Sequence, residues 1–515
     1  MKSKLYIILS LLLAQQAYAQ LPEDALRMSW IIPSGTARQQ AIGGAMGSLG
    51  GEISALFTNP AGLGMYKTGE IVLTPGYTFS TGKGMYRGTD IKASGLSQFS
   101  FGTSGVVWGS SDKYSKWTSK AIAIGVNQTA NFNNTVHYKG LNDYSSFAEP
   151  LANEFANSGL TIDQALNNSN ISLQTKMALY TYLVDTMTIG GLTQVIARSE
   201  MAGVVNQENT VEHSGGITEI SLGFAANMDD KLYLGGSLGV PIVNYERFSI
   251  YNEEDANGKG NNEFNSSKYT ETFTSKGVGI NLKLGLIFKP ADFLRFGLAI
   301  HTPSFYGLTD KVVSEMTTDI DPATGSVKIF NVKSSAFYNG TDPEFKYDLT
   351  TPWKFMISGS YVFREVEDIT RQKGFITADI EYTNYAWMKY APYEGETPDD
   401  TKADYDPYNE AIDAVYKGTF NFRVGGELKF ETIMARAGFA YYTSPYKHDE
   451  LKGRKMFISG GLGYRNKGMF IDLTYVQRLN KDISLPYRVT PPRANTFADL
   501  KENGGNVLLT VGFKI

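Results

Sequence analysis

The amino-acid sequence predicts an all-β protein: a 14-stranded antiparallel transmembrane β-barrel with an N-terminal hatch, or plug, and a helical extracellular loop. Three observations lead to this prediction. Apolar residues alternate with small or polar residues over stretches of about ten residues. The composition is rich in glycine and aromatic residues, with 53 Gly, 31 Tyr and 29 Phe. The links between the alternating segments are short and long by turns, as in bacterial barrels.

The chain begins with the pattern of a secretory signal peptide. A charged start, a short apolar run and an Ala-x-Ala site follow one another at Lys2 and Lys4, residues 5–14 and residues 17–19. The apolar run is shorter than the roughly 20 residues that a spanning helix needs, which disfavours a membrane anchor. We therefore expect residues 1–19 to be removed, so that the mature chain begins at Gln20.

The composition also excludes two other classes of protein. An exported chain of 515 residues without cysteine is not stabilised by disulfides and depends on its hydrogen-bonded architecture. The formal net charge of -4 offers no basic excess with which to hold nucleic acid. We therefore expect no nucleic-acid partner.

The stretch "GVGINLKLGLIF", residues 277–288, shows the alternation most clearly. One face carries Val278, Ile280, Leu282, Leu284, Leu286 and Phe288, and the other carries glycines, Asn281 and Lys283. The last strand, "NVLLTVGFKI", repeats the pattern and places Lys514 opposite its apolar face. A soluble β-sandwich turns its apolar face inward, so a polar interior that holds lysines favours a membrane barrel.

Fourteen segments fit this description. The predicted strands are residues 70–81, 95–108, 118–137, 213–228, 231–250, 268–289, 293–308, 344–364, 372–388, 416–430, 432–445, 453–465, 468–482 and 504–515. The long links are 138–212, 251–267, 309–343, 389–415 and 483–503. The short turns are expected in the periplasm and the long links outside the cell.

The link 138–212 shows helical periodicity. In "SSFAEPLANEF" and "SLQTKMALYTYLVDTM", apolar residues recur at spacings of three and four, including Leu173, Met177, Leu179, Leu183 and Met187. Short amphipathic helices on the extracellular rim could form a lid or a capture surface, or a packed cap that only covers the barrel mouth. The sequence does not separate these two interpretations.

Residues 20–69 are the material available to fill the barrel. A lumen of this strand number is too wide for the wall side chains to fill, so we expect a hatch at 20–69 and a barrel at 70–515. The hatch segment contains "GGAMGSLGG", residues 43–51, and the turn Asn59-Pro60-Ala61-Gly62. Glycine allows close packing and Pro60 fixes one φ angle. The glycine run lacks the pattern of a nucleotide-binding loop.

The hatch segment carries a resemblance. "ARQQAIGGAMGSLGGEISALFTNPAGLG" resembles the hatch of the FadL/TodX family of outer-membrane transporters for long-chain fatty acids and other hydrophobic compounds. Further similarity runs through "GVGINLKLGLIFKPADFLRFGLAIHTPSFYGLTD", "TTPWKFMISGSYVF", "GFITADIEYTNY", "FNFRVGGELKF" and "MARAGFAYYTSPY". The similarity covers nearly the whole mature chain, in the order of the predicted strands.

The resemblance implies passive uptake of hydrophobic molecules through a hatch-closed barrel in the outer membrane of a Gram-negative bacterium. It implies capture at an extracellular groove, passage to an apolar lumen pocket and exit through a lateral gap at a kinked third strand. The implied partners are a fatty acid-like ligand, outer-membrane lipid and lipopolysaccharide, and the barrel-assembly machinery. No cofactor is implied.

The family's hatch motif falls on Asn59, Pro60 and Ala61, followed by Gly62, and this turn is expected to act as the hinge or latch of the plug. The third strand, "SKAIAIGVNQTANFNNTVH", is expected to form the lateral gate at Gly125, Asn127 and Asn131, because glycine and asparagine weaken strand pairing. The chain ends in Ile515, with Phe513 two residues before it, where barrels often end in an aromatic residue.

Catalytic and metal sites find little support. His137, His213, His301 and His448 are scattered, and neither a zinc-binding H-E-x-x-H motif nor a G-x-S-x-G motif occurs. We interpret the acidic stretch "TPDDTKADYDPYNEAID" as a solvated surface loop. We expect no enzyme, and the alternatives are a haem-binding receptor or a surface binding or adhesion protein anchored by the barrel. About fifty residues ahead of the wall would obstruct a general porin.

Overall fold

The computed structural model describes most of the chain after residue 21. The described residues are 22–30, 32–258, 260, 262–322, 328–363, 373–393, 402–449, 451–490 and 493–515. The predicted signal peptide at residues 1–19 and the acidic residues Asp399 and Asp400 lie outside the described residues.

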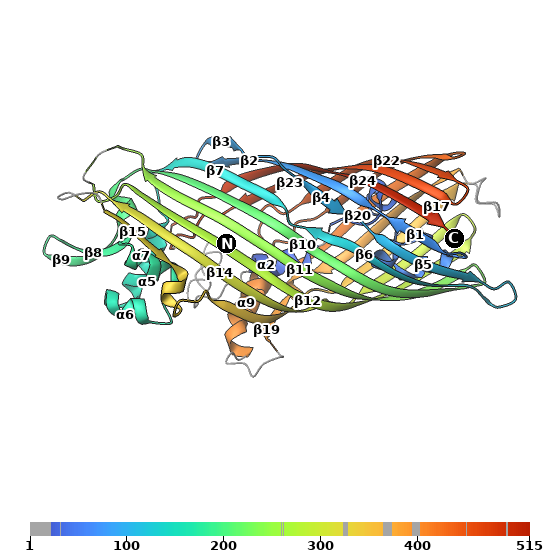
Figure 1. Ribbon diagram of the computed structural model, residues 1–515, viewed down its shortest axis with the longest axis horizontal. Coiled ribbons are helices and arrows are strands. Elements are labelled where there is room, and N and C mark those ends of the chain that lie inside the picture. Colours follow the sequence, from blue (N-terminus) through green and yellow to red (C-terminus); the bar gives the residue numbers. More distant parts are fainter. Residues whose placement is uncertain are drawn as a thin grey trace.

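Fourteen antiparallel strands close into a barrel, which confirms the predicted fold class (Figure 1). The wall consists, in order, of β1 and β2 (Glu70–Leu73, Pro75–Tyr86), β4 and β5 (Leu96–Phe101, Ser104–Ser111), β6 and β7 (Trp117–Asn131, Asn134–Asn142), β10 (Val205–Met228), β11 (Leu232–Asp255), β12 (Ser266–Ala291), β13 and β14 (Leu294–His301, Phe305–Ile320), β16 and β17 (Glu344–Thr350, Lys354–Phe363), β18 and β19 (Gly374–Asn384, Lys389–Pro392), β20 (Gly418–Phe430), β21 (Ile433–Tyr442), β22 (Lys455–Asn466), β23 (Met469–Ser484) and β24 (Ala498–Lys514). The last strand closes the barrel by pairing with β1 and β2, where Glu70 lies opposite Lys514.

The outer face of the wall is apolar and the inner face is polar. On β12, Val278, Ile280 and Leu284 are each about half exposed, whereas Lys283 is 5% exposed and lies in the lumen. Lys514, in contrast, is exposed at the end of its strand rather than buried in the lumen. An apolar outer band around a polar interior is the construction of an outer-membrane barrel, and the protein is a multi-pass barrel of this kind.

Among the described residues, no helix is both long and apolar enough to cross a membrane.

Several wall strands extend further than predicted on the side of the long links. The helical link predicted at 138–212 is confined to residues 143–204, because β7 continues to Asn142 and β10 begins at Val205. β14 continues to Ile320, so the link predicted at 309–343 was wrong for its first part. Beyond the bilayer both faces of a strand can be polar, and the apolar alternation that predicted the strands is absent there.

Residues 143–204 form a compact structure at the extracellular end, which we call the extracellular cap. It contains α5 (Ala148–Ser158), α6 (Ile162–Asn167), α7 (Leu173–Tyr180), the hairpin β8 and β9 (Val184–Ile189, Leu192–Ala197) and α8 (Arg198–Met201). The helical periodicity predicted through Met187 is wrong beyond Tyr180. The run Val184–Ile189 alternates β-branched residues and ends at Gly190-Gly191, a sequence that favours a hairpin.

The cap packs on the barrel mouth through an apolar core. Phe147, Leu151 and Phe155 from the start of the cap are buried against Tyr251 and Tyr269 on β11 and β12. Phe147 stacks on the Tyr269 ring with centroids 5.6 Å apart. The described cap is therefore a packed cover rather than a set of free helices.

The acidic segment also differs from its prediction as a solvated loop. Its described part forms α9 (Lys402–Val415), which buries Tyr405, Tyr408 and Ile412. These side chains join a tyrosine-rich cluster with Leu26 of α2 (Pro22–Ser29). The tyrosines lie at helical spacing, and burying their rings outweighs the charge of the segment. Outside the hatch segment, the other described elements are β3 (Thr89–Lys92), β15 (Lys328–Lys333) and the short 3-10 helices at Ser334–Phe337 and Tyr385–Trp387.

The buried ion pair between Lys283 and Glu219 allows the contribution of the polar lumen to stability to be measured. The two side chains are 7% and 3% exposed, and Lys283 also donates to Asn281 Oδ1 at 2.7 Å. Lys283→Met leaves the carboxylate buried without its cation, which we expect to lower the free energy of unfolding by about 3 kcal/mol. Urea unfolding of the refolded barrel, followed by heat-modifiable gel mobility, measures this loss. Lys283→Met/Glu219→Gln should recover much of the lost free energy of unfolding. An equal loss in the single and the double variant would show that the unpaired Glu219 carboxylate is not its cause.

Candidate functional site: the hatch, the lumen and an interrupted strand

The segment that precedes β1 lies inside the barrel (Figure 1). After α2 it forms α3 (Ala37–Ala41), α4 (Ala55–Thr58) and the 3-10 helix η1 (Pro60–Met65). α3 packs against β21 to β24, and η1 packs against β6 and β10 to β12 on another part of the wall. The described hatch segment therefore reaches the wall through elements at both of its ends.

Asn59 fixes the hatch turn to the wall. Its Oδ1 accepts from the Ala61 amide at 3.2 Å and so caps η1. Its Nδ2 donates to Gly47 O at 2.6 Å and lies 3.2 Å and 3.3 Å from the carbonyl oxygens of Leu286 and Leu298, a register pair of β12 and β13. One side-chain amide thus joins the turn, the glycine run and two wall strands.

The next residues of the turn keep it compact. Pro60 occupies the first position of η1, where a missing amide hydrogen is tolerated. Gly62 donates to Asn59 O at 3.0 Å and accepts from Gly51 N at 2.9 Å. A Cβ at Gly62 would lie 2.7 Å from Gly50 Cα, so the turn and the glycine run touch along their backbones.

Lumen-facing glycines of the wall form the seat of the hatch. A Cβ at Gly235 would lie 2.5 Å from Pro60 C, and a Cβ at Gly285 would overlap Asn59 Oδ1. The same close approach to hatch atoms occurs at Gly223, Gly297, Gly425, Gly438 and Gly461. The hatch backbone can touch the wall only because these positions lack a side chain.

Wall side chains also satisfy the backbone of the hatch. Hydroxyl groups donate from Ser119 to Gly64 O at 2.6 Å, from Ser237 to Leu56 O at 2.8 Å, and from Thr474 to Ala37 O at 2.6 Å. His301 Nε2 donates to Thr58 O at 2.8 Å. These bonds replace the water that would otherwise solvate the irregular backbone.

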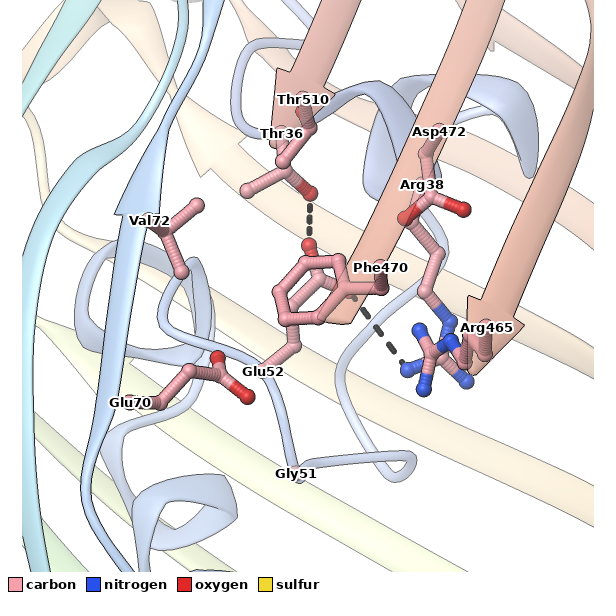
Figure 2. A pocket seen from close by; sticks show the side chains of 10 residues that line it. All are labelled: Thr36, Arg38, Gly51, Glu52, Glu70, Val72, Arg465, Phe470, Asp472 and Thr510. Carbon is pink, nitrogen blue, oxygen red and sulfur yellow. Dashed lines mark hydrogen bonds and ion pairs between the residues drawn. The ribbon is translucent and has the colours of Figure 1, made fainter. Parts of the chain in front are cut away.

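A charged cluster joins the hatch to the last wall strands; Figure 2 shows Arg38 and Glu52 of the hatch beside Arg465 and Asp472 of the wall. Arg38 of α3 lies 3.9 Å from Glu52 and 3.3 Å from Glu427, and Arg436 lies 2.6 Å from Glu427 and 2.5 Å from Asp472. The cavity that Arg38, Glu52 and Asp472 help to line is only about 10 Å³. Burial raises the pKa of Glu52, a hatch residue outside the wall strands, to about 7, although Arg38 opposes this shift. We call this cluster the charged floor.

A larger cavity, of about 70 Å³, lies between the hatch and the wall. Hatch residues Phe57 and Thr58 line it, together with Asn127 and Thr129 of β6. Its charged lining residues are Glu219, Lys283, Lys354, Glu381 and Arg423. This cavity differs from the apolar lumen pocket that the family resemblance implied.

The third wall strand is interrupted beside this cavity. β6 pairs with β10 as far as Asn131, but with β5 only as far as Val126. β4, which precedes β5, pairs with β2 alone. Among the described residues, the edges of β4 and of residues 127–133 therefore face each other without ladder hydrogen bonds. We call this gap the wall window.

Asn133 maintains the other side of the interruption. Its side-chain amide accepts from Gly215 N at 3.0 Å and donates to Gly215 O at 3.2 Å. It thus makes the two hydrogen bonds that the backbone of a neighbouring strand would make to β10. Asn131 Oδ1 in turn accepts from Asn133 N at 3.0 Å and from its Nδ2 at 2.6 Å. Asn131 was predicted from the sequence as a gate residue and Asn133 was not, although the run "NFNN" contains both.

The other residues of the proposed gate differ in their surroundings. Asn127 donates to Ser34 Oγ of the hatch at 3.0 Å, which joins the window edge directly to the plug. Gly125 is paired on both sides, to Gly105 and Ser221, so the interruption begins after it rather than at it. The charged floor was also missed, since Arg38 and Glu427 are 389 residues apart in the sequence.

The glycine seat predicts a specific effect of one methyl group. Gly285→Ala should displace the Asn59 turn because the new Cβ overlaps Asn59 Oδ1. In a chain without native cysteine, Ala61→Cys, at a position 0% exposed, reports the displacement as faster maleimide labelling. Gly359→Ala is the matched control, because a Cβ there meets only Phe296 Cδ1 at 4.0 Å. Equal labelling rates in Gly285→Ala and Gly359→Ala would show that the Asn59 turn does not rest against Gly285.

Comparisons with known proteins place the fold. No model of a known protein family and no curated protein matches the sequence. A crystal structure of a Pseudomonas aeruginosa FadL homologue aligns with a TM-score of 0.53 at 13% identity, over 94% of this chain and 99% of that one. The Ralstonia pickettii toluene transporter TbuX aligns with a TM-score of 0.49 at 13% identity, and the P. putida toluene transporter TodX with 0.48 at 12%, each over 94% of this chain and 99% of the other. The chain therefore has the fold of the FadL homologue.

Proposed function

We propose that this protein takes up long-chain fatty acids or similar hydrophobic molecules across the outer membrane. Uptake is passive, the N-terminal hatch gates it, and the ligand leaves sideways through the barrel wall. The observation that carries the proposal is the contrast between two routes past the hatch. Buried ion pairs of the charged floor obstruct the route toward the periplasm, whereas the lateral route meets the wall window.

The charged floor opposes exit toward the periplasm. Arg436, Glu427 and Asp472 are almost fully buried and are joined by short ion pairs. An apolar molecule that crossed this layer would have to separate these pairs without solvating them, which is strongly unfavourable. The direct route to the periplasm is therefore the unfavourable one for a hydrophobic ligand.

The wall window supports the lateral route. It begins where β6 loses its pairing with β5, and Asn127 and Thr129 line both the window edge and the larger cavity. On the outer side, Phe99 and Phe101 of β4 are 82% and 41% exposed, toward the lipid. A ligand that leaves the cavity here passes from the lumen directly into the apolar layer of the membrane.

The lining of this route favours a molecule with a polar end. Gln98 of β4 and Asn127 and Asn131 of β6 each retain a buried polar atom without a hydrogen-bond partner among the described residues. The cavity itself is lined by charged groups. A carboxylate or hydroxyl group on an apolar chain can satisfy such groups, whereas a bare hydrocarbon leaves them desolvated. This favours a fatty acid.

The hatch turn provides the mechanical connection. Phe57 and Thr58 at the end of α4 line the cavity, and η1, which packs against β6, follows directly after Asn59. We propose that the turn transmits a displacement of α4 to the strand that borders the window. Asn59, Pro60, Ala61 and Gly62 then act as a hinge between the cavity and the wall.

Uptake of a radiolabelled long-chain fatty acid tests the proposal in cells that lack their own transporter. The intact protein should give saturable uptake, and Asn59→Ala should lower it about tenfold at equal surface expression, because a lost set of buried hydrogen bonds is worth about 1.4 kcal/mol. Thr129→Trp, which fills the window edge, should lower uptake as well.

The controls separate transport from assembly. Gly359→Ala should transport like the parent protein, and heat-modifiable gel mobility should show that every variant is folded. Saturable uptake that is unaffected by Thr129→Trp would remove the lateral route but keep the function. No uptake by the folded parent protein would refute the fatty-acid assignment and favour a surface binding role.

A further inference from the structure

Glu253 is a fully buried carboxyl group at the extracellular end of β11. Its side chain is 0% exposed, and within the described parts of the chain no ion pair joins it to a cation. Three donors surround it: Phe147 N at 2.7 Å, Gln207 Nε2 at 2.7 Å and Tyr251 OH at 3.2 Å. The first of these is the backbone amide just ahead of α5.

All three groups donate their hydrogen bonds to the same carboxyl oxygen, Oε1. Oε2 accepts no hydrogen bond from any described donor, and the Ser199 hydroxyl of α8 faces the carboxyl group. In a neutral carboxylic acid, one oxygen accepts and the other carries the proton and donates. Glu253 Oε2 and Ser199 Oγ both lack a hydrogen-bond partner among the described residues. A buried carboxyl group with no cation beside it favours the neutral acid, whose proton Oε2 would carry.

Gln207 extends the contact to the rest of the barrel mouth. Its Nε2 also lies 2.8 Å from Tyr487 OH and 3.1 Å from Ser145 O. Its Oε1 accepts from Tyr86 OH at 2.7 Å and from Asn142 Nδ2 at 2.8 Å. Glu253 and Gln207 together join β2, β7, β10, β11, the cap and the link 485–497.

The charged groups around this network do not compensate a buried anion at Glu253. From the elements packed against it come Glu149 of α5, Glu200 of α8, Glu254 of its own strand, Arg493 of the link 485–497, and Arg198 of α8. Arg493 lies 2.5 Å from Glu149, and Arg198 is paired with Asp185 and Glu263 at 2.7 Å and 2.5 Å. The titratable hydroxyls facing it belong to Tyr86, Tyr251 and Tyr487.

We propose that Glu253 is a pH-dependent latch of the extracellular cap, which holds the start of α5 on the barrel while the carboxyl group is protonated and releases it when the group ionises. The proposal is independent of the transported molecule. It assigns a regulatory role to a residue of β11, outside the hatch segment.

Electrostatics gives the direction of the effect. Burial raises the pKa of Glu253 from 4.5 to about 7, because desolvation outweighs the hydrogen bonds from Phe147, Gln207 and Tyr251. The closed cap thus binds the proton more tightly than an open, hydrated one. Protonation favours the closed cap fully at a pH below 4.5, the ordinary pKa of the hydrated carboxyl group. This preference is lost as the pH rises through about 7, the pKa of the buried group. Between pH 5 and pH 8 the ratio of open to closed cap should rise by roughly 10-fold to 100-fold.

Distance measurement between two spin labels tests the latch in the full-length protein. Ala156→Cys on α5 and Lys268→Cys on β12 are both exposed, and the chain has no other cysteine. We expect one narrow distance distribution at pH 5 and a second, longer population at pH 8. Glu253→Gln, which mimics the protonated group, should give the narrow distribution at both pH values.

Glu254→Gln is the matched control, since Glu254 is the exposed neighbour on the same strand. It should keep the pH response of the parent protein. An identical distribution at pH 5 and pH 8 in the parent protein would overturn the proposal without any variant. A pH response that persists in folded Glu253→Gln would overturn it too, because another group would then be responsible.

Discussion

The structure depends on one constraint: in lipid, every backbone amide and carbonyl of the wall must find a partner within the protein. The barrel meets this constraint by closing on itself, with β24 paired to β1 and β2. Among the described wall strands, the wall window departs from this constraint. On the side that faces β10, the side-chain amide of Asn133 bonds to the backbone of Gly215. On the side that faces β4, no ladder hydrogen bond joins the described residues.

A closed wall of this size creates a second problem, which is its wide lumen. The hatch solves it through backbone contact rather than through side-chain packing alone. Gly235 and Gly285 let the Asn59 turn lie directly on the wall, and hydroxyl groups such as Ser237 satisfy the carbonyls of the hatch. Such a plug is held by many weak and specific contacts.

The sequence predicted the wall well and its extensions poorly. Val278, Ile280 and Leu284 alternate with lumen residues because one face meets lipid, and that periodicity is visible in the chain. Where β10 and β14 leave the membrane, both faces can be polar and the signal is lost. The tyrosines of α9 were overlooked because the acidic residues around them suggested a solvated loop.

For the candidate site, the sequence by itself determined the turn Asn59-Pro60-Ala61-Gly62 and the weakness of the third strand, because proline, glycine and asparagine impose local backbone geometry. Only the tertiary structure decided where the turn sits and which residues meet it. The Arg38–Glu427 pair, the Asn133–Gly215 bridge and the network of Glu253 join residues that are distant along the chain. Such contacts depend on the register and closure of the barrel, which local periodicity does not encode.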